Sequence, residues 1–410
     1  MAKVEIPLGP QHPALKEPAN FALSLDGERI IGAAVNLGYN HRGVEKACES
    51  RTYIQCRQLL ERICGICSHS HSTAFVNAVE ELAGVEIPPR AHWIRVMIAE
   101  LERLHSHMLW LGVAGHELGF DTLFMLSWRD RELVLDLLTR IAGNRVNYGI
   151  NKLGGVRFDI TDSQLNDIKI VVGKLEEAIK YYIDLVTTET TLAARMLGVG
   201  VLSHEDALTY GASGPTARAA AVNRDIRRDD PYSSYEEIPF EVIIDDHADV
   251  FGRAVVRAKE LAESCKIIRY VVDNLPDGPL DVKFPRKVPE GETVSRYEAP
   301  RGEDVHYVKA NGTDKPERVK VRAPTLANAA SYALMLQDNY LADVPIIVAA
   351  IDPCFSCTDR SISLIDFRNG QQGSLDWQAL RRYSIDWYRN QGVNFDDLNK
   401  NLDRSLNRKM

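Results

Sequence analysis

The sequence contains two short stretches built around a Cys-x-x-Cys pair: RICGICSHSH at residues 62–71 and DPCFSCTDR at residues 352–360. A two-residue spacer lets both sulfurs of a pair face one ion across a turn. The thiolate is the form that binds, so metal binding deprotonates each pair. Four thiolates suit zinc, iron–sulfur clusters or nickel. We therefore predict one metal centre with Cys64, Cys67, Cys354 and Cys357 as its ligands, joining the two ends of one folded body.

The spacing of the two pairs leaves the kind of metal open. Zinc ribbons place their pairs about 15–20 residues apart, whereas most of this chain separates Cys67 from Cys354. A structural zinc, an iron–sulfur cluster and another redox metal all remain compatible with the spacing. The cysteines number seven and no signal-peptide pattern opens the sequence, so we do not expect a disulfide framework.

Composition excludes some classes of function. The 410 residues are 45% hydrophobic and 26% charged, which is ordinary for a globular protein, and the formal net charge is −8. Because nucleic-acid-binding proteins usually carry a basic face, we expect no nucleic-acid partner. Apolar runs such as Val344–Ile351 are far shorter than the ~20 residues that span a bilayer. We expect the chain itself to be soluble, and held at any membrane by partners.

Hydrophobic periodicity predicts an α+β fold that is mostly helical. Helical spacing is found over residues 44–83, interrupted near the first cysteine pair, and over 90–111, 130–142, 161–192, 249–275 and 324–339. Alternation predicts antiparallel strands within residues 4–36 and 276–325, and residues 344–351 read as a buried strand or extended segment. Residues 210–240 read as a long ordered loop or a surface lid. We expect one domain over residues 1–360 and a polar extension over 361–410.

The residues that flank the cysteines closely resemble the two end signatures of [NiFe]-hydrogenase large subunits, RxCGxCxxxH and DPCxxCxxH/R. The segments YEAPRG at 297–302, Pro324-Thr325 and RGVEK at 42–46 fit the same family. GPQHP at 9–13, the helix around 100–107 and the loop at 211–232 are similar to the branch shared by membrane-bound hydrogenases and the complex I 49-kDa subunit. The resemblance covers the chain up to Arg360. It implies the hydrogenase large-subunit fold, with long central helices and small peripheral antiparallel sheets.

The resemblance also implies a centre of one nickel and one iron, with carbon monoxide and cyanide on the iron. By motif match, Cys64 and Cys354 are terminal nickel ligands, and Cys67 and Cys357 bridge nickel and iron. The chemistry that it implies is the heterolytic splitting and re-formation of hydrogen, in which a nearby base takes the proton.

Three further residues are expected to be catalytic by the same match. Arg301 is expected over the open metal face, as a base or as a donor to a cyanide; the alternative is a turn arginine paired with Glu303. Asp352 is expected beside the metals as a charged group, unless it only starts an Asp-Pro turn. Glu17 matches the glutamate that takes protons from the nickel site, and the alternative is a surface carboxylate beside Pro18.

The surroundings of the centre follow by the same match. His71 is expected beside a bridging sulfur, and Pro324 with Thr325 beside a cyanide, although Thr325 also suits a helix N-cap. Glu45 matches a glutamate that binds a structural magnesium together with a C-terminal histidine. Arg360 stands where relatives carry that histidine, which puts the magnesium in doubt and makes a Glu45–Arg360 ion pair the alternative hypothesis.

One histidine and three cysteines are expected outside the centre. His105 is expected to pack at a partner interface, because it lies two positions from His107 on a helix and the two rings must face different sides. Cys48, Cys56 and Cys265 are expected to be small buried residues.

The resemblance implies a subunit of a larger assembly on the cytoplasmic, inner face of the cell membrane. The chain has no spare cysteine cluster, so a small subunit with a [4Fe–4S] cluster and ferredoxin-like cluster subunits are expected as partners. Complex I-like membrane subunits would anchor the assembly. Nickel-insertion proteins and a maturation endopeptidase that cuts after Arg360 would load and trim the chain.

The expected function is reversible proton reduction to hydrogen with electrons from reduced ferredoxin, coupled through partners to ion translocation. The alternative is a non-hydrogenase, complex I-like subunit that helps to form a quinone site. That relative generally lacks the four cysteines, which this chain keeps.

Overall fold

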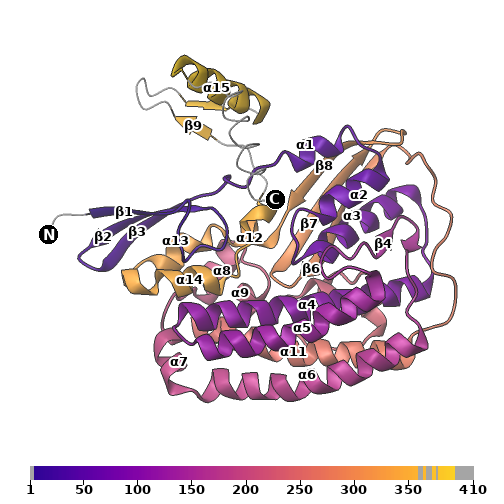
Figure 1. Ribbon diagram of the computed structural model, residues 1–410, viewed down its shortest axis with the longest axis horizontal. Coiled ribbons are helices and arrows are strands. Elements are labelled where there is room, and N and C mark those ends of the chain that lie inside the picture. Colours follow the sequence, from indigo (N-terminus) through magenta and orange to yellow (C-terminus); the bar gives the residue numbers. More distant parts are fainter. Residues whose placement is uncertain (1–3, 359–362, 366–371, 375–376, 393–410) are drawn as a thin grey trace, which may run out of the picture. The chain divides into compact units, whose positions relative to one another are not determined.

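The computed structural model describes residues 4–358, 363–365, 372–374 and 377–392 (Figure 1). The chain divides into two compact units, one of residues 1–40 and 44–359 and the other of 41–43 and 360–410. In the second unit, strands β9 (Ser363–Ile365) and β10 (Gln372–Ser374) pair antiparallel, and helix α15 spans Trp377–Asn390. All the other elements belong to the first unit.

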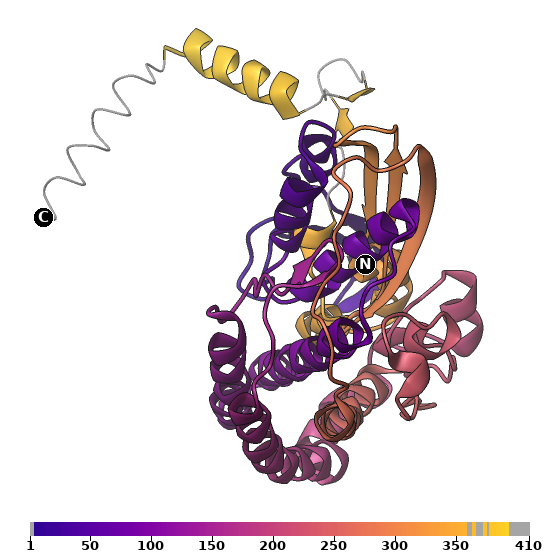
Figure 2. The ribbon, with the colours of Figure 1, turned by 90° about the vertical axis from the view of Figure 1, so that its right-hand side faces the viewer.

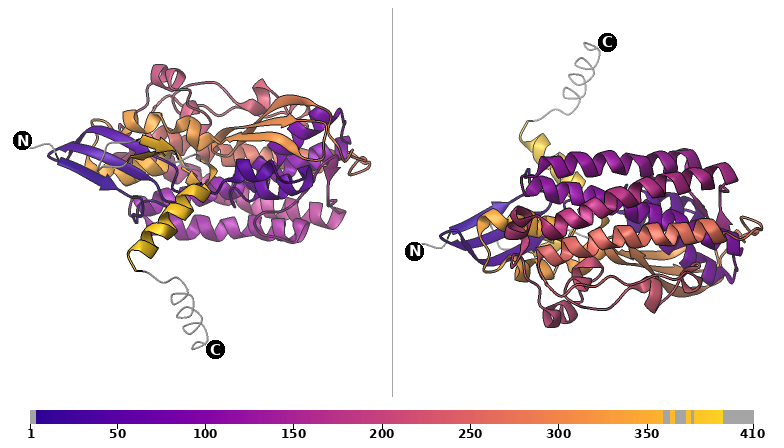
Figure 3. Two further views of the ribbon diagram at one scale, coloured as in Figure 1. Left: turned by 90° about the horizontal axis from the view of Figure 1, so that it is seen from above. Right: turned by 90° about the horizontal axis from the view of Figure 1, so that it is seen from below.

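Four long helices form the centre of the first unit: α4 (Pro89–Glu117), α5 (Asp121–Ala142), α6 (Asp162–Thr188) and α11 (Val250–Asn274). They lie side by side, with α4 packed against α5 and α11, and α11 packed against α6 (Figures 1 and 3). Apolar residues of all four helices form one buried cluster. Helices α4 and α11 are buried over most of their lengths, and this burial includes charged side chains.

Two three-stranded antiparallel sheets flank the helices. The first has the order β1 (Val4–Leu8), β2 (Asn20–Asp26), β3 (Arg29–Asn36), and its alternating Phe21, Leu23 and Leu25 enter a second apolar cluster. The second sheet has the order β6 (Gly291–Ala299), β7 (Gly302–Ala310), β8 (Pro316–Arg322). Helix α3 (Ser68–Ala83) packs against β6 and β7, on the same side of the long helices as that sheet (Figures 1 and 2).

Short elements complete the first unit. The short helices are α1 (Val44–Cys48), α2 (Tyr53–Glu61), α7 (Thr190–Met196), α8 (His204–Thr209), α9 (Pro215–Arg218), α10 (Ile226–Asp229), α12 (Pro324–Asn328), α13 (Ser331–Leu336) and α14 (Val344–Ala350). Three single 3-10 turns cover Tyr235–Glu237, Leu341–Asp343 and Phe355–Cys357, and β4 (Asn151–Lys152) pairs with β5 (Gly155–Val156). In the part of the chain that the structure describes, no helix combines the length and apolarity that a membrane span needs.

The predicted α+β, mostly helical class is confirmed, and so are the antiparallel strands within residues 4–36 and 276–325. The prediction of a strand over residues 344–351 is wrong, because this run forms α14, with Pro345 in its first turn. A short apolar run that is buried on all sides cannot be assigned by periodicity, and proline is favoured where a helix begins. The helix predicted over residues 324–339 is two short helices, α12 and α13.

Residues 210–240 form an ordered loop with short helical turns, which confirms one of the two expectations for this segment. The other, a surface lid, is wrong. Arg218, Asp225 and Arg227 in this segment are at most 2% exposed. A segment that places three charged side chains in the interior is part of the core structure and cannot open without exposing or unpairing them.

Candidate metal centre

The four predicted cysteines meet in one buried cluster, although they come from two distant parts of the chain. Their sulfurs all lie within 4.8 Å of one another. Cys354 Sγ lies 3.3 Å from Cys64 Sγ and 2.9 Å from Cys357 Sγ, and Cys67 Sγ lies 3.6 Å from Cys357 Sγ. No cysteine of the four is more than 6% exposed. Four sulfurs at these separations form a donor set for soft or borderline metals.

Helix ends place the two pairs. The first pair fills the turn between α2 and α3, where Cys67 is the residue before the first turn of α3. The second pair follows α14, and the amide of Cys354 donates to Thr325 Oγ1 at 2.9 Å. Asp352, which joins α14 to this pair, has a φ of 60°. Aspartate tolerates this left-handed conformation better than most residues with a side chain, and here it turns the chain from α14 into the second cysteine pair.

The buried carboxylate of Glu102 on α4 anchors the beginning of α3. It accepts from the amide of His69 at 2.7 Å and from the amide of Ser70 at 3.0 Å. The first amides of a helix have no partner within the helix, so a carboxylate there satisfies them. Burial raises the pKa of Glu102 to about 7. Glu102 thus ties the turn of the first cysteine pair to the central helices.

The four thiols cannot all carry charge without a cation. Hydrogen bonds from Cys354 and Cys357 lower the pKa of Cys64. Burial, however, raises the pKa of Cys357. In a buried cluster one thiolate disfavours the next, and a bound cation removes this penalty by pairing with every thiolate. The donor set and its burial therefore fit the metal pair that the sequence resemblance implies.

Arg301 and Asp352 form a buried pair beside the cysteines. Arg301 Nη2 lies 3.0 Å from Asp352 Oδ1, and its Nε donates to the carbonyl oxygen of Asp352 at 2.9 Å. Arg301 Nη1 and Asp352 Oδ2 have no hydrogen-bond partner among the described residues. Asp352 is thus an ionic partner as well as a turn residue, and the alternative pairing of Arg301 with Glu303 is wrong.

A close approach of two glycines holds the turn that carries Arg301. Gly302 has a φ of 127°, and a Cβ there would lie 2.8 Å from the amide nitrogen of Gly214. A Cβ on Gly214 would lie 2.3 Å from the Cα of Gly302. Neither position has room for a side chain, so the loop over residues 210–240 packs directly on the backbone next to Arg301.

Glu17 is half-buried and reaches the second cysteine pair from the N-terminal segment. Its Oε2 accepts from the amide of Ser356 at 2.9 Å, and its Oε1 accepts from the hydroxyl of the same serine. Glu17, Arg301, Asp352 and Cys354 also line a cavity of about 520 Å³, whose other walls are mainly apolar. This cavity gives small molecules a route to one side of the cysteine cluster.

Thr325, Pro324 and His71 line a second, small pocket at the cluster, together with Cys67 and Cys357. Thr325 is not a helix N-cap, because Ala323 holds that position of α12. Its oxygen accepts from the amide of Cys354, which leaves the hydroxyl hydrogen available as a donor. His71 Nε2 lies 3.3 Å from Cys357 Sγ. Sequence reasoning missed Asp304 and His306, which lie against His71 and come from the strand that follows the YEAPRG segment.

Two predicted residues lie outside this cluster. Glu45 accepts from the amide of Val321 at 2.9 Å, and its Oε2 lies 3.9 Å from Arg318 Nη2. The proposed partner Arg360 lies outside the described residues, so the magnesium and ion-pair hypotheses for Glu45 both remain predictions. The expectation that His105 packs at a partner interface is wrong. His105 is fully buried within this chain, 2.6 Å from the Tyr148 hydroxyl.

Cys48, Cys56 and Cys265 are fully buried, as expected. None of the three lies in a described group of possible metal ligands, and the sulfur of Cys56 donates to the carbonyl oxygen of Cys48.

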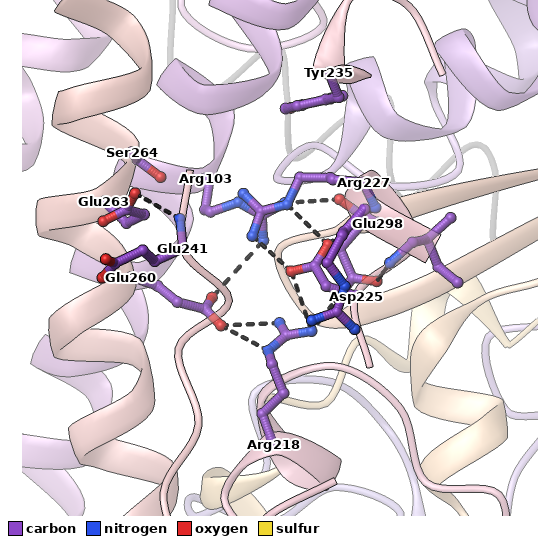
Figure 4. Close-up of polar contacts among 12 residues, drawn as sticks. Arg103, Arg218, Asp225, Arg227, Tyr235, Glu241, Glu260, Glu263, Ser264 and Glu298 are labelled. Atoms are coloured by element: carbon purple, nitrogen blue, oxygen red, sulfur yellow. Dashed lines mark hydrogen bonds and ion pairs between the residues drawn. The ribbon is translucent and has the colours of Figure 1, made fainter. Parts of the chain in front are cut away.

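A buried ionic network lies between α4, α11, the 210–240 loop and β6 (Figure 4). We call it the ionic network; its members are Glu100, Arg103, Arg218, Asp225, Arg227, Glu260 and Glu298, each at most 2% exposed. Arg218 is its centre. It donates through Nε to Glu260 at 2.9 Å and through Nη1 to Glu298 at 2.8 Å. Glu298 lies on β6 just before the turn that carries Arg301. The network therefore helps to hold that turn in place beside the four cysteines.

Replacing Arg218 by methionine is expected to destabilise the fold by about 3–5 kcal/mol. It leaves Glu298 buried without its ion-pair partner and leaves Glu260 with the more distant Arg103, 3.8 Å away. Burial alone favours the neutral acid, but Arg218 and its neighbours lower the pKa of Glu260 below its ordinary 4.5. The stabilisation from Glu260 is therefore present above pH 4.5 and is lost as the pH falls through the lower folded pKa.

Denaturant unfolding near pH 7 measures this loss. Arg224→Met is the matched control. Arg224 is 53% exposed in an ion pair of 3.5 Å, so its removal should cost less than about 1 kcal/mol. Equal small losses in both variants would contradict a structural role for the network.

The fold and the buried four-thiol cluster define a large subunit of the kind shared by nickel-dependent hydrogenases and complex I. Comparison with known families agrees. The family of the respiratory-chain NADH dehydrogenase 49 Kd subunit matches residues 117–288 and 282–360, and the nickel-dependent hydrogenase family matches residues 42–113.

Individual relatives match most of the chain. The membrane-bound hydrogenase subunit alpha of Pyrococcus furiosus is 41% identical over 93% of both chains. The carbon monoxide-induced hydrogenase of Rhodospirillum rubrum is 38% identical over 88% of this chain and all of the relative. A subunit of the membrane-bound sulfane sulfur reductase, an archaeal respiratory membrane complex, superposes with a TM-score of 0.84 at 33% identity, covering 87% of this chain and 98% of that subunit. The chain therefore belongs to the family of complex I 49-kDa and nickel-dependent hydrogenase large subunits.

Proposed function

We propose that the chain is the catalytic large subunit of a membrane-associated [NiFe] hydrogenase. The observation that carries this proposal is the buried cluster of four cysteine sulfurs within 4.8 Å of one another, flanked by the Arg301–Asp352 pair and by Glu17. The family includes subunits with names other than hydrogenase, so membership alone does not assign the activity. The four thiols supply the chemistry that distinguishes a hydrogenase from a scaffold.

In this proposal Cys64 and Cys354 would hold nickel, and Cys67 and Cys357 would hold nickel together with an iron that carries carbon monoxide and cyanide. When bound, such a pair of metals supplies the redox centre at which hydrogen is split heterolytically or formed. The protein contributes positioned polar groups around it. Thr325 would offer its hydroxyl hydrogen to a cyanide of such a group, and His71 faces the sulfur of Cys357.

Proton transfer is the task proposed for Glu17. Its carboxylate contacts both the amide and the hydroxyl of Ser356, which lies between the two cysteines of the second pair. It also lines the cavity that ends at Cys354, Arg301 and Asp352. A carboxylate held between a redox centre and a cavity is placed to exchange protons with either.

Arg301 is proposed to orient the reacting molecule with its free Nη1, while Asp352 holds the other two guanidinium nitrogens. Replacing Arg301 by lysine keeps the charge but loses the planar set of donors. We expect hydrogen evolution to fall by about 10²-fold, the usual cost of removing one preorganised donor.

Hydrogen evolution by the purified complex, together with its nickel content, tests this expectation. Arg286→Lys, at an arginine that is 88% exposed, is the control and should match the parent. Unchanged hydrogen evolution by the Arg301→Lys variant, at equal nickel content, would show that Arg301 takes no part in the reaction.

The remaining parts of the proposal concern the assembly. Relatives are named as subunits of membrane-bound complexes. We propose a small subunit with a [4Fe–4S] cluster, ferredoxin-like cluster subunits and complex I-like membrane subunits as partners, at the cytoplasmic face of the membrane. Electrons would come from ferredoxin, and ion translocation would be driven through the partners. Two further kinds of partner are proposed. They are nickel-insertion proteins and a maturation endopeptidase that cuts after Arg360.

The second candidate function is a complex I-like subunit that helps to form a quinone site. The match to the 49 Kd subunit family and the mainly apolar cavity beside Glu17 favour it. One assay of the purified complex separates the two. Hydrogen evolution with reduced ferredoxin supports the hydrogenase, whereas quinone reduction without any hydrogen turnover supports the alternative.

A further inference from the structure

A second buried group of possible ligand residues adjoins the metal centre. His71 belongs to α3, and Asp304 and His306 belong to β7; all three are at most 1% exposed. His71 Nδ1 lies 3.1 Å from His306 Nε2 and 3.0 Å from Asp304 Oδ2, and His306 Nε2 lies 3.2 Å from Asp304 Oδ2. The other nitrogen of His71, Nε2, lies 3.3 Å from Cys357 Sγ. We call these three residues the His–Asp–His triad.

We propose that His306, together with Asp304, is a positioning residue that fixes His71 so that its Nε2–H donates to the sulfur of Cys357. The effect on the metals rests on the proposed function above. A histidine can donate a hydrogen bond to a metal-bound sulfur only if the nitrogen that faces the sulfur carries a hydrogen. The hydrogen-bond partner of the other ring nitrogen decides which nitrogen carries it.

Two arrangements of the ring hydrogens of His71 give this result. If His71 is neutral, its Nδ1 accepts from the Nε2–H of His306, and the ring hydrogen must then sit on Nε2. If His71 is cationic, Nδ1–H points to the Asp304 carboxylate and Nε2 carries the second hydrogen. In both arrangements the hydrogen on Nε2 points toward Cys357. A neutral ring with its only hydrogen on Nδ1 would instead turn a nitrogen lone pair toward a metal-bound thiolate, and the donor that His306 supplies to Nδ1 disfavours this form.

Asp304 and His306 are well placed to hold the ring still. They lie two positions apart on one strand, so both side chains project from the same face of β7. That face packs against α3, which carries His71. The strand is bonded on both sides, by β6 and by β8, so it is a rigid support. Asp304 also lines the small pocket that contains Cys67, Cys354 and Cys357.

A hydrogen bond to a thiolate withdraws electron density from the sulfur, and such bonds tune metal–sulfur centres. Without the hydrogen bond from His71, a thiolate bound to iron would donate more electron density to the metal. The iron would then donate more electron density to its carbon monoxide ligand. Losing the donor should therefore move the infrared carbon monoxide band to lower wavenumber without removing the metals.

The test compares three variants of the purified complex by infrared spectroscopy and by nickel and iron analysis. His306→Phe keeps the ring volume but removes the donor, and its carbon monoxide band should move to lower wavenumber. His306→Gln places an amide N–H near the position of Nε2 and should restore the parent band. Tyr307→Phe, on the opposite face of the same strand, is the control and should leave the band unchanged.

Several results would overturn the inference. One is an unshifted band in His306→Phe with nickel and iron at the parent level. Another is a third metal ion per chain that is lost with His306, because the triad would then be a metal site. If His306→Phe does not accumulate, His306→Asn replaces it, since its shorter amide cannot reach His71; identical bands in the Asn and Gln variants would overturn the inference. A parent complex with no carbon monoxide bands would remove the proposed function, and the inference with it.

Discussion

Replacing Cys357 by serine is expected to abolish hydrogen turnover and to lower the nickel content of the purified complex to background. The serine oxygen is a hard ligand that stays protonated near pH 7, whereas nickel is held by soft thiolates. Cys357 Sγ lies 2.9 Å from Cys354 Sγ and 3.6 Å from Cys67 Sγ, so its loss disturbs both pairs. Metal analysis and a hydrogen-evolution assay on one preparation measure both effects.

Cys265→Ala is the matched control for this prediction. Cys265 is fully buried among the long helices but lies in a different apolar cluster from the four cysteines. Its replacement should leave nickel and activity at the parent level. Full nickel loading in Cys357→Ser would contradict the assignment of the ligands.

Replacing Glu17 by glutamine is expected to slow hydrogen turnover by about 10²–10⁴-fold, the usual contribution of a positioned proton-transfer group. The amide keeps the shape, and its oxygen can still accept from the amide of Ser356, but it cannot take up and release a proton at neutral pH. The metals should stay in place, because Glu17 touches Ser356 and not a sulfur. Exchange between hydrogen and deuterated water follows the proton step directly.

Glu28→Gln, at an exposed glutamate in the turn between β2 and β3, is the control for Glu17. Its exchange rate should equal that of the parent. A Glu17→Gln complex that exchanges at the parent rate, with equal nickel content, would show that protons reach the centre by another route.

The sequence predicted the centre better than it predicted the structure around it. Two Cys-x-x-Cys pairs have a direct chemical meaning, and their flanking motifs resemble one family, so Cys64, Cys67, Cys354 and Cys357 were expected together. The structure brings them within 4.8 Å of one another. It also brings Glu17 to the second pair and Arg301 to Asp352, contacts that no local pattern specifies.

Other features depend on tertiary contacts that a single sequence does not reveal. The run from Val344 to Ala350 is apolar throughout, so it has no periodicity to distinguish a buried helix from a buried strand. The charged residues of the 210–240 loop favoured a surface position, yet Arg218 and Arg227 find partners on α4, α11 and β6. Nothing in the strand pattern around His306 distinguishes this residue. Its role depends on the fold, which places His71 of α3 beside it.

The most direct test of the proposed metal centre is the metal content and infrared spectrum of the chain purified with its natural partners from a host that matures hydrogenases. We predict about one nickel and one iron per chain, with bands of carbon monoxide and cyanide. Zinc alone, or no metal, in an intact complex from that host would contradict this prediction. That result would leave the chain as a structural or quinone-binding member of its family.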